Sequence, residues 1–349
     1  MRAVPIWFAI VLGVVQGLTE FLPVSSSAHL RITPALLGQH DPGAAFTAVL
    51  QLGTLAAVIV YFARDLFIDL PRAMIRDPRS PQGRLPLLIV LGTVPIVVAG
   101  LAAEDLVEGA LRSLWVIVGT LAGLGVVLAV IDARARGART LDDLGVRDAI
   151  IIGCAQALAL CPGVSRSGAT IVAALVVGLR RSDAARFSFL LGIPAIAGAA
   201  ILKSKDAMTA LGPGAWKPLT VALLAAAITG YVSIAWLLRF LGSHRLVGFA
   251  WYRGAIAAVV AALLISGTIG EFEGVDEVTA DEHPAAVSVE SAGPPPSPAA
   301  TQARCCSGTT TRPSRSSSRP SRSRRDYTSS LRHPRSLGRP RGRPFVSRG

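Results

Sequence analysis

Apolar stretches recur along the first 270 residues, separated by short polar segments. They cover roughly 4–19, 43–62, 86–103, 114–131, 149–160, 169–179, 187–202, 218–241 and 247–270. Several reach the about 20 residues that a helix needs to cross a bilayer, but 4–19, 149–160 and 169–179 are shorter. We therefore expect helices throughout, with the short stretches forming tilted, broken or re-entrant segments.

Composition supports a membrane location. Of the 349 residues, 51% are hydrophobic and 16% are charged, and the mean hydropathy is +0.52. Soluble domains carry about 25% charged residues. The chain is therefore expected to be an all-α, polytopic integral membrane protein embedded in the lipid bilayer.

The pattern changes near residue 270, so we expect a membrane-embedded domain at 1–270 and a disordered tail at 271–349. The tail is acidic over 271–282, then rich in Pro, Ala and Ser, and finally rich in Arg, Ser and Pro. Residues 304–349 hold 13 of the 35 basic residues and one acid, Asp326. The tail could contact anionic lipid or nucleic acid, but an extension without function is favoured, and no nucleic-acid partner is expected.

Loop charges predict an orientation. Loop 63–85 has five Arg against three Asp, and loop 132–148 has four Arg against four acids. Loop 104–113 has three acids and one Arg. Because basic loops stay inside, 63–85 and 132–148 are expected in the cytoplasm and 104–113 outside.

An internal repeat relates the two halves, approximately 1–131 and 149–270. G-x-x-Q-x-L occurs at 13–18 and again at 153–158. The same offset maps Val24-Ser25-Ser26-Ser27 onto Val164-Ser165-Arg166-Ser167. A proline, Pro23 or Pro162, precedes each serine cluster. Two such halves predict a duplicated unit, expected to be of inverted topology, whose broken helices meet near the membrane midplane.

Each repeat carries polar residues where a bilayer disfavours them. In the first, Gln16 and Glu20 share a helix face, and Pro23 ends that helix. Three serines and His29 then open the next helix, whose N-terminal N–H groups attract anions. In the second, a Pro-Gly turn precedes Ser165-Arg166-Ser167, and Arg166 suits phosphate oxygens. Together the two clusters predict one site for a phosphate-bearing ligand with an apolar remainder.

Structural roles are the alternative for single residues. The serines could only cap a helix, His29 could be an interfacial histidine, and Glu20 with Arg166 could form a structural pair. The combination of acid, hydroxyl, imidazole and guanidinium favours chemistry.

The segments GVVQGLTEFLPVSSSAHL (13–30), FTAVLQLGTLAAVIVYFARDL (46–66), CPGVSRSGATI (161–171) and ARFSFLLGIPA (185–195) resemble the undecaprenyl-diphosphatase family, also called bacitracin-resistance proteins. The resemblance covers about 4–270. It implies hydrolysis of undecaprenyl diphosphate to undecaprenyl phosphate and inorganic phosphate. This would recycle the lipid carrier for cell-wall synthesis and confer bacitracin resistance. It also implies a site facing the outer side of the bacterial cytoplasmic membrane.

The first family motif, E-G-x-x-E-F-x-P-x-S-S-[ST]-x-H, departs from the family only in its first Glu, here Gln16. Its other functional positions are Glu20, Ser25, Ser26, Ser27 and His29. The second motif, P-G-x-S-R-S-G-[AS]-T, is intact. Its positions here are Pro162, Gly163, Ser165, Arg166, Ser167, Gly168 and Thr170.

We assign roles from this chemistry. Glu20, Ser26, His29 and Arg166 are the expected catalytic residues, with Ser26 as nucleophile and His29 as its base. Ser25 and Ser27 are alternative nucleophiles, and direct attack by water stays open. The remaining motif residues, Gln16, Ser25, Ser27, Gly163, Ser165, Ser167, Gly168 and Thr170, are expected to bind substrate.

Other expectations concern partners and the rival function. Glu20 would orient His29 or help to hold a divalent cation, Mg²⁺ or Ca²⁺. A transporter or flippase for polyprenyl phosphate would need the same anion site but no nucleophile. A homodimer and the preferred prenyl length are left open by the sequence.

Overall fold

The computed structural model describes residues 4–102, 113–210 and 216–269. Over these ranges the chain is helical, with one isolated bridge between Arg139 and Leu179 and no other strand pairing. The expected outer loop 104–113 and the tail 271–349 lie outside this part, except for Ser113.

The helices are α1 Ile6–Phe21, α2 Ser26–Leu36, α3 Gly43–Tyr61, the π-helix η1 Asp65–Asp69, α4 Leu70–Arg76, α5 Pro81–Ala102, α7 Leu114–Arg134, the 3-10 helix η3 Leu141–Asp143, α8 Val146–Ala157, the 3-10 helix η4 Leu158–Leu160, α9 Arg166–Val176, α10 Arg181–Ala210, α11 Trp216–Leu241 and α12 Val247–Ile265.

Five described helices are long and apolar enough to cross a membrane. These are α5, α7, α10 over Arg181–Leu202, α11 and α12. A sixth crossing is added if α3 and the η1–α4 segment, which bend by 64°, form one broken span. Many large apolar side chains on these helices are exposed, among them Val98, Ile228 and Trp251. Such surfaces suit lipid contact, so the expected polytopic membrane fold is confirmed.

Two helices break where the sequence predicts it. α1 ends before Pro23 and α2 begins at Ser26, and the corresponding break separates α8 and η4 from α9. Each break contains one serine with a positive φ angle, 74° at Ser25 and 64° at Ser165. Among the described non-glycine residues only these two have positive φ. The sequence repeat is therefore matched by a repeated backbone conformation.

Segment 63–85, which the sequence analysis treats as a loop, is largely helical. Asp65–Asp69 forms a π-helix that continues into α4, and both follow the bend after α3. Its polar residues recur at helical spacing, as described for the cavity below.

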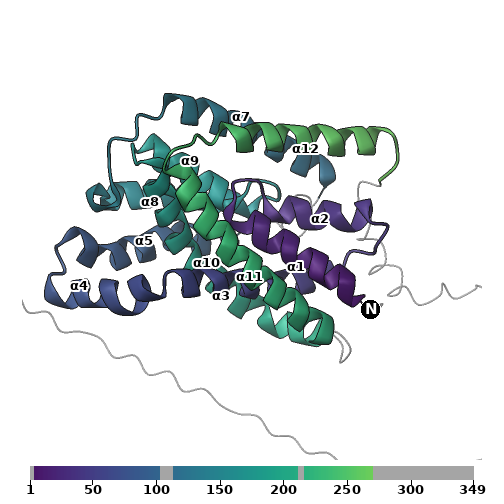
Figure 1. Cartoon of the computed structure of the whole chain (residues 1–349), viewed down its shortest axis with the longest axis horizontal. Helices are drawn as coiled ribbons and strands as arrows, with labels where there is room; N and C mark the ends of the chain where they lie inside the picture. The colour runs from purple at the N-terminus through teal and green to yellow at the C-terminus, as the bar shows by residue number, and fades with distance from the viewer. Residues whose placement is uncertain (1–3, 103–112, 211–215, 270–349) are drawn as a thin grey trace, which may run out of the picture. The chain divides into compact units, whose positions relative to one another are not determined.

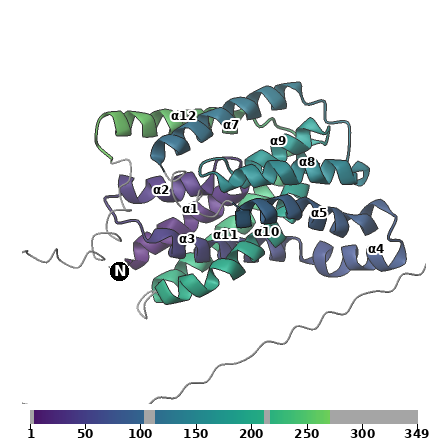
Figure 2. The same cartoon turned by 180° about the vertical axis from the view of Figure 1, so that it is seen from behind.

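Helices of the first half pack against helices of the second half. α1 packs chiefly against α11, and its repeat counterpart α8 packs against α5 (Figure 1). Gly13 allows the first contact, since a Cβ there would collide with the backbone of Ala222. Gly153 meets the backbone of Gly92 in the second contact. α7 and α12, the last helix of each half, lie side by side in both views (Figures 1 and 2). The inverted direction of the halves stays a prediction.

Candidate active site

The two helix breaks meet although 140 positions separate them. The Oγ of Ser27 accepts a hydrogen bond from the N–H of Gly163 at 3.3 Å. The Oγ of Ser167 donates to the carbonyl of Leu22 at 3.0 Å. In both bonds the donor belongs to the second motif and the acceptor to the first, so the second turn is fixed to the first at two points.

Both following helices begin at this junction. Ser25 accepts a hydrogen bond from the N–H of Ala28 at 3.5 Å, and Ser165 accepts one from Gly168 at 3.2 Å. These serines therefore cap α2 and α9 while holding a costly left-handed conformation. Strain of this kind persists where the surrounding structure enforces it. Two positive helix ends converge here, which favours an anionic ligand.

Glu20 connects the two motifs. One carboxylate oxygen, Oε1, pairs with the guanidinium of Arg166. The other, Oε2, accepts hydrogen bonds from the Ser26 hydroxyl at 2.5 Å and from the Gln16 amide at 3.1 Å. Glu20 is only 8% exposed, so these donors stabilise its charge. The structural pair that the sequence left as an alternative exists, and it also contacts the candidate nucleophile.

His29 differs from its expected role as the base for Ser26. Its Nδ1 lies 2.7 Å from the carbonyl of Ser25, which can only accept, so Nδ1 carries the proton. Nε2 then accepts from the hydroxyl of Tyr252 at 2.8 Å, and the two rings stack with an interplanar angle of 4°. The structure gives Ser26 a different partner, because its hydroxyl donates to Glu20.

Arg253, which the sequence analysis missed, is fully buried behind the junction. Its guanidinium donates to the carbonyl of Pro23 at 3.2 Å and to that of Gly163 at 3.0 Å, one from each turn. Further bonds reach Thr120 at 3.1 Å and Leu121 at 3.2 Å on α7. A planar fork with five donors can serve carbonyls in several directions, so Arg253 ties both turns to α7.

The predicted hydroxyl groups fall into two classes. Ser26 is half-buried and Ser27 is exposed, so both are open to a ligand. Ser25 and three hydroxyls of the second motif are buried and bonded within the protein. Those three are Ser165, Ser167 and Thr170, and Thr170 bonds Ser188 at 2.5 Å. Direct substrate contact by the buried group stays a prediction.

The two motif glycines allow close packing. Gly163 has φ +87°, and a Cβ there would collide with the hydroxyl of Thr120 and press against the backbone of Ile117. A Cβ on Gly168 would press against Leu124. Gly163 is therefore needed to seat the second turn against α7, and Gly168 lets Leu124 pack closely against α9.

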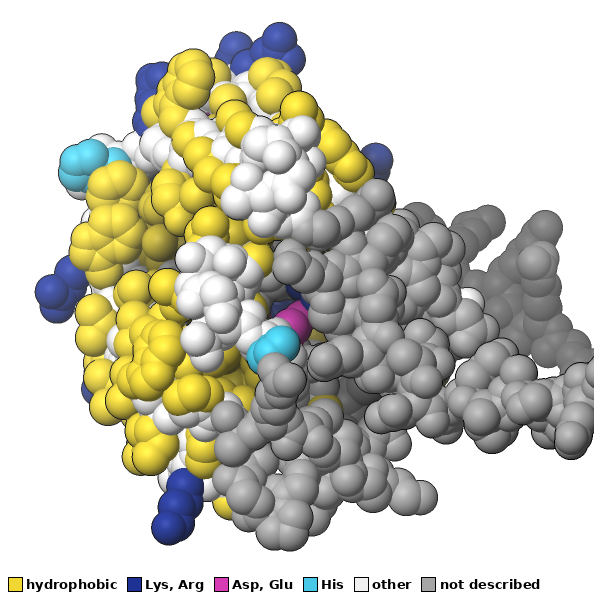
Figure 3. All heavy atoms as spheres, turned by 90° about the vertical axis from the view of Figure 1, so that its right-hand side faces the viewer, with side chains coloured by type: hydrophobic (Ala, Val, Ile, Leu, Met, Phe, Trp, Pro, Cys, Tyr) yellow, Lys and Arg dark blue, Asp and Glu magenta, His cyan; other side chains and the backbone are white. Residues whose placement is uncertain are grey.

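Part of the junction is accessible at the surface. Arg166 and His29 are half-buried and Ser27 is exposed, so each has surface left for a ligand. Figure 3 shows a face of the molecule on which apolar side chains surround a few acidic, basic and histidine side chains. Polar groups beside apolar surface suit a charged headgroup on a lipid.

The donor set for a divalent cation is small. Among the described residues no group of three or more His, Cys, Asp or Glu could hold a metal ion. Glu20 offers a carboxylate, and Oε1 of Gln16 is buried without a hydrogen-bond partner. Mg²⁺ commonly binds one or two carboxylates together with substrate phosphates. These residues therefore fit a cation that the substrate helps to bind.

Comparison with known proteins agrees with this chemistry. The family model described as bacitracin resistance protein BacA matches residues 9–259. A protein named undecaprenyl-diphosphatase from Myxococcus xanthus is 46% identical over 288 residues, covering 81% of this chain and 97% of that protein. Proteins of the same name from a Nocardioides species and from Kineococcus radiotolerans are 45% and 47% identical, each covering 75% of this chain and at least 95% of their own length.

Proposed function

This chain belongs to the bacitracin resistance protein BacA family, and we propose that it hydrolyses undecaprenyl diphosphate to undecaprenyl phosphate and inorganic phosphate. The observation that carries this function is the contact of Ser26 and Arg166 with the same carboxylate, Glu20. A nucleophile, a base and a phosphate-binding cation are thereby joined at two helix N-termini. The activity recycles the lipid carrier for cell-wall synthesis and provides bacitracin resistance.

The first step transfers a phosphoryl group to Ser26. The terminal phosphate lies against Arg166 and the N-terminal N–H groups of α2 and α9, which neutralise its charge. The Oγ of Ser26 attacks the terminal phosphorus while Glu20 takes the hydroxyl proton. The bond from phosphorus to the bridging oxygen breaks, and undecaprenyl phosphate leaves with that electron pair.

The second step releases phosphate. Glu20, which has passed its first proton to the departing undecaprenyl phosphate, accepts a proton from water while the water oxygen attacks the phosphoserine phosphorus. The bond from phosphorus to the Oγ of Ser26 breaks, and Glu20 returns its proton to that oxygen. His29 holds the Ser25 carbonyl next to the nucleophile, and Tyr252 fixes its ring. A divalent cation held by Glu20 and Gln16 would supply further positive charge to the phosphates.

The position of the site favours the outer side of the cytoplasmic membrane. α9 starts at the site, and its last turn meets the predicted cytoplasmic loop, where Arg139 donates to the carbonyl of Val177 at 2.6 Å. The Asp148 carboxylate accepts a hydrogen bond from Arg139 and raises the pKa of that guanidinium. The 11 residues of α9 span roughly 16 Å, which separates the site from the cytoplasmic boundary.

The test is phosphate release from undecaprenyl diphosphate by the full chain in detergent, where no gradient exists. We expect release by the wild type and a loss of about 100-fold or more in Ser26→Ala and in Glu20→Gln. Acid quenching should trap phosphoserine at Ser26 in the wild type. Normal turnover by Ser26→Ala would exclude the covalent step and favour direct attack by water. Lipid movement in vesicles without any phosphate release would instead favour a transporter.

A further inference from the structure

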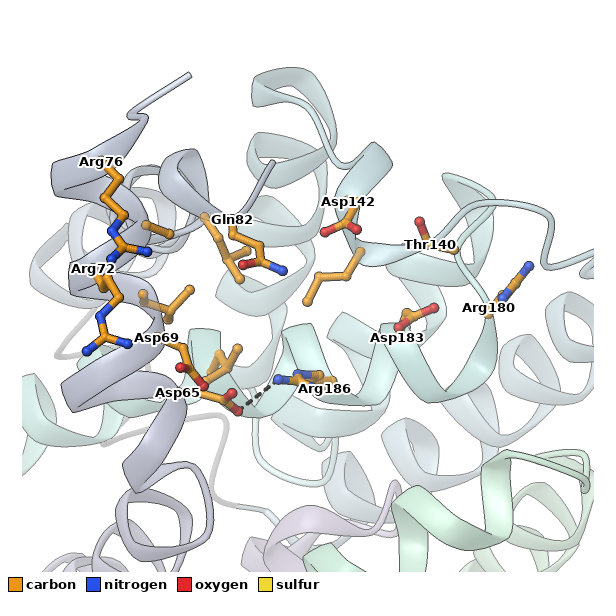
Figure 4. A pocket seen from close by; sticks show the side chains of 15 residues that line it. Asp65, Asp69, Arg72, Arg76, Gln82, Thr140, Asp142, Arg180, Asp183 and Arg186 are labelled. Carbon is orange, nitrogen blue, oxygen red and sulfur yellow. Dashed lines mark hydrogen bonds and ion pairs between the residues drawn. The ribbon is translucent and has the colours of Figure 1, made fainter. Parts of the chain in front are cut away.

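A cavity of about 760 Å³ lies among the segments that the loop charges predict to face the cytoplasm. Its walls come from η1 and α4, the first turn of α5, η3 and the start of α10 (Figure 4). None of the residues assigned to the active site lines it. Its lining is rich in charged side chains, which sets it apart from a packing defect between apolar helices.

One wall of this cavity is an amphipathic segment. Asp65, Asp69, Arg72 and Arg76 are spaced by four, three and four residues, so they form one polar stripe, and all four line the cavity. The other side of η1–α4 carries exposed apolar residues, with Phe67 at 69%, Ile68 at 48%, Met74 at 47% and Ile75 at 80% exposure.

A helix with this division lies in the membrane interface, with its apolar face in the acyl region. The 64° bend after α3 turns the segment away from the direction of that helix, as an interfacial position requires. The polar stripe, and the cavity behind it, are therefore at the depth of the lipid headgroups.

The η1 part of this wall is a π-helix. π-helices are rare in proteins, and the single π turns that do occur are often found at functional sites. Both ends of the π-helix, Asp65 and Asp69, have ion-pair partners, Arg186 at 2.8 Å and Arg64 at 3.4 Å. The negative charges of Asp65 and Asp69 are thus neutralised by ion pairs, while the charges of Arg72 and Arg76 are not.

Arg72 and Arg76 lie one turn apart, and within the described part of the chain neither guanidinium has a hydrogen bond or ion pair. Like charges at this spacing repel. Across the cavity stand two carboxylates, Asp142 and Asp183, whose side chains likewise have no ion pair with a described residue (Figure 4). Arg180 and Arg186 line the same side and offset part of the charge of Asp183. Within the described part of the chain, the cavity therefore sets two unpaired arginines opposite two unpaired carboxylates.

We propose that this cavity binds a zwitterionic phosphoethanolamine headgroup from the adjacent membrane leaflet. The phosphate diester accepts hydrogen bonds from Arg72 and Arg76, and the ammonium group donates to Asp142 and Asp183. An anionic headgroup without an amine would leave the two carboxylates unpaired. A choline headgroup has a cation of similar charge but no N–H to donate to them.

Native mass spectrometry of the full chain in detergent tests the proposal. The protein is mixed with phosphatidylethanolamine, phosphatidylglycerol or phosphatidylcholine of identical acyl chains, and the retained lipid is measured. We expect phosphatidylethanolamine to be retained best. The double variant Arg72→Gln/Arg76→Gln should reduce that retention by at least about tenfold, because the loss of even one charge-assisted hydrogen bond has an effect of this size. Asp142→Asn/Asp183→Asn should abolish the preference over phosphatidylglycerol.

Arg79→Gln is the matched control, because Arg79 is exposed in the same basic segment and does not line the cavity. Thermal melting confirms that each variant is folded. Equal retention of the three lipids overturns the proposal, as does an Arg72→Gln/Arg76→Gln variant that retains as much as the control. Binding of soluble O-phosphoethanolamine at millimolar concentration, with no preference among the lipids, would place the source in solution and refute the lipid assignment.

Discussion

Arg253 should be a positioning residue whose replacement by Lys slows the reaction. The Arg253→Lys change is not conservative here, because one ammonium group with three donors replaces a planar fork with five. The guanidinium reaches four carbonyls on three segments, including Pro23 of the first turn and Gly163 of the second. We expect an ammonium group to keep about two of these bonds.

The structure gives a magnitude for this change. Interhelical bonds in membranes contribute about 0.6 kcal/mol, and hydrogen bonds to charged groups contribute up to about 3 kcal/mol, so two lost bonds cost on the order of 1–6 kcal/mol. Part of this loss releases the turn at Pro23 from the turn at Gly163. Because small displacements of reacting groups are costly, we expect kcat to fall about 10- to 100-fold, with a smaller change in KM.

The assay is steady-state phosphate release from undecaprenyl diphosphate, at a temperature well below the melting point of each variant. Arg253→Met, which leaves all four carbonyls without a donor, should be slower still and less stable. Arg239→Lys is the control, because Arg239 is exposed in the last turn of α11. If Arg253→Lys melts at a lower temperature but turns over at the wild-type rate, Arg253 stabilises the fold and does not position the turns.

Three further predictions concern the site and the tail. Gly163→Ala should lower phosphate release by at least about tenfold, because the new Cβ meets Thr120 while φ stays positive, and a normal rate would show that the turn adapts. Gln16→Glu should lower the Mg²⁺ concentration for half-maximal phosphate release by about tenfold, since it adds a second carboxylate beside Glu20, and an unchanged Mg²⁺ dependence would contradict the cation assignment. A chain ending at Gly270 should release phosphate at the rate of the full chain, and a large loss would show that the tail is needed.

The helix breaks and their meeting could be predicted because they depend on strong local rules. Pro23 and Pro162 end helices, and polar side chains such as Glu20 are costly in a bilayer unless they face a partner. The repeated sequence pattern also indicated that the two breaks are equivalent. These constraints apply to short segments, so they can be recognised without knowledge of the packing.

The helical segment at 65–76 was missed because its high charge resembles a loop. Its polar residues nevertheless repeat at intervals of four and three, from Asp65 to Arg76, which is the period of a helix. Arg253 was missed for a different reason, since the stretch 247–270 was treated as a plain span. An arginine within an apolar stretch is itself an indication of a buried partner, and that rule applied here.

The partner of Ser26 could not be obtained from the sequence at all. Glu20 and His29 are both near Ser26 along the chain, and both residue types serve as bases. The choice depends on the backbone of the turn, because a positive φ at Ser25 directs its carbonyl to His29 while the Ser26 hydroxyl reaches Glu20. Glu20 is also the partner of Arg166, so the proposed base is held by the proposed phosphate-binding group. When the phosphate draws Arg166 away from Glu20, the carboxylate loses a stabilising cation and becomes a stronger acceptor for the Ser26 proton, so substrate binding itself would activate the nucleophile.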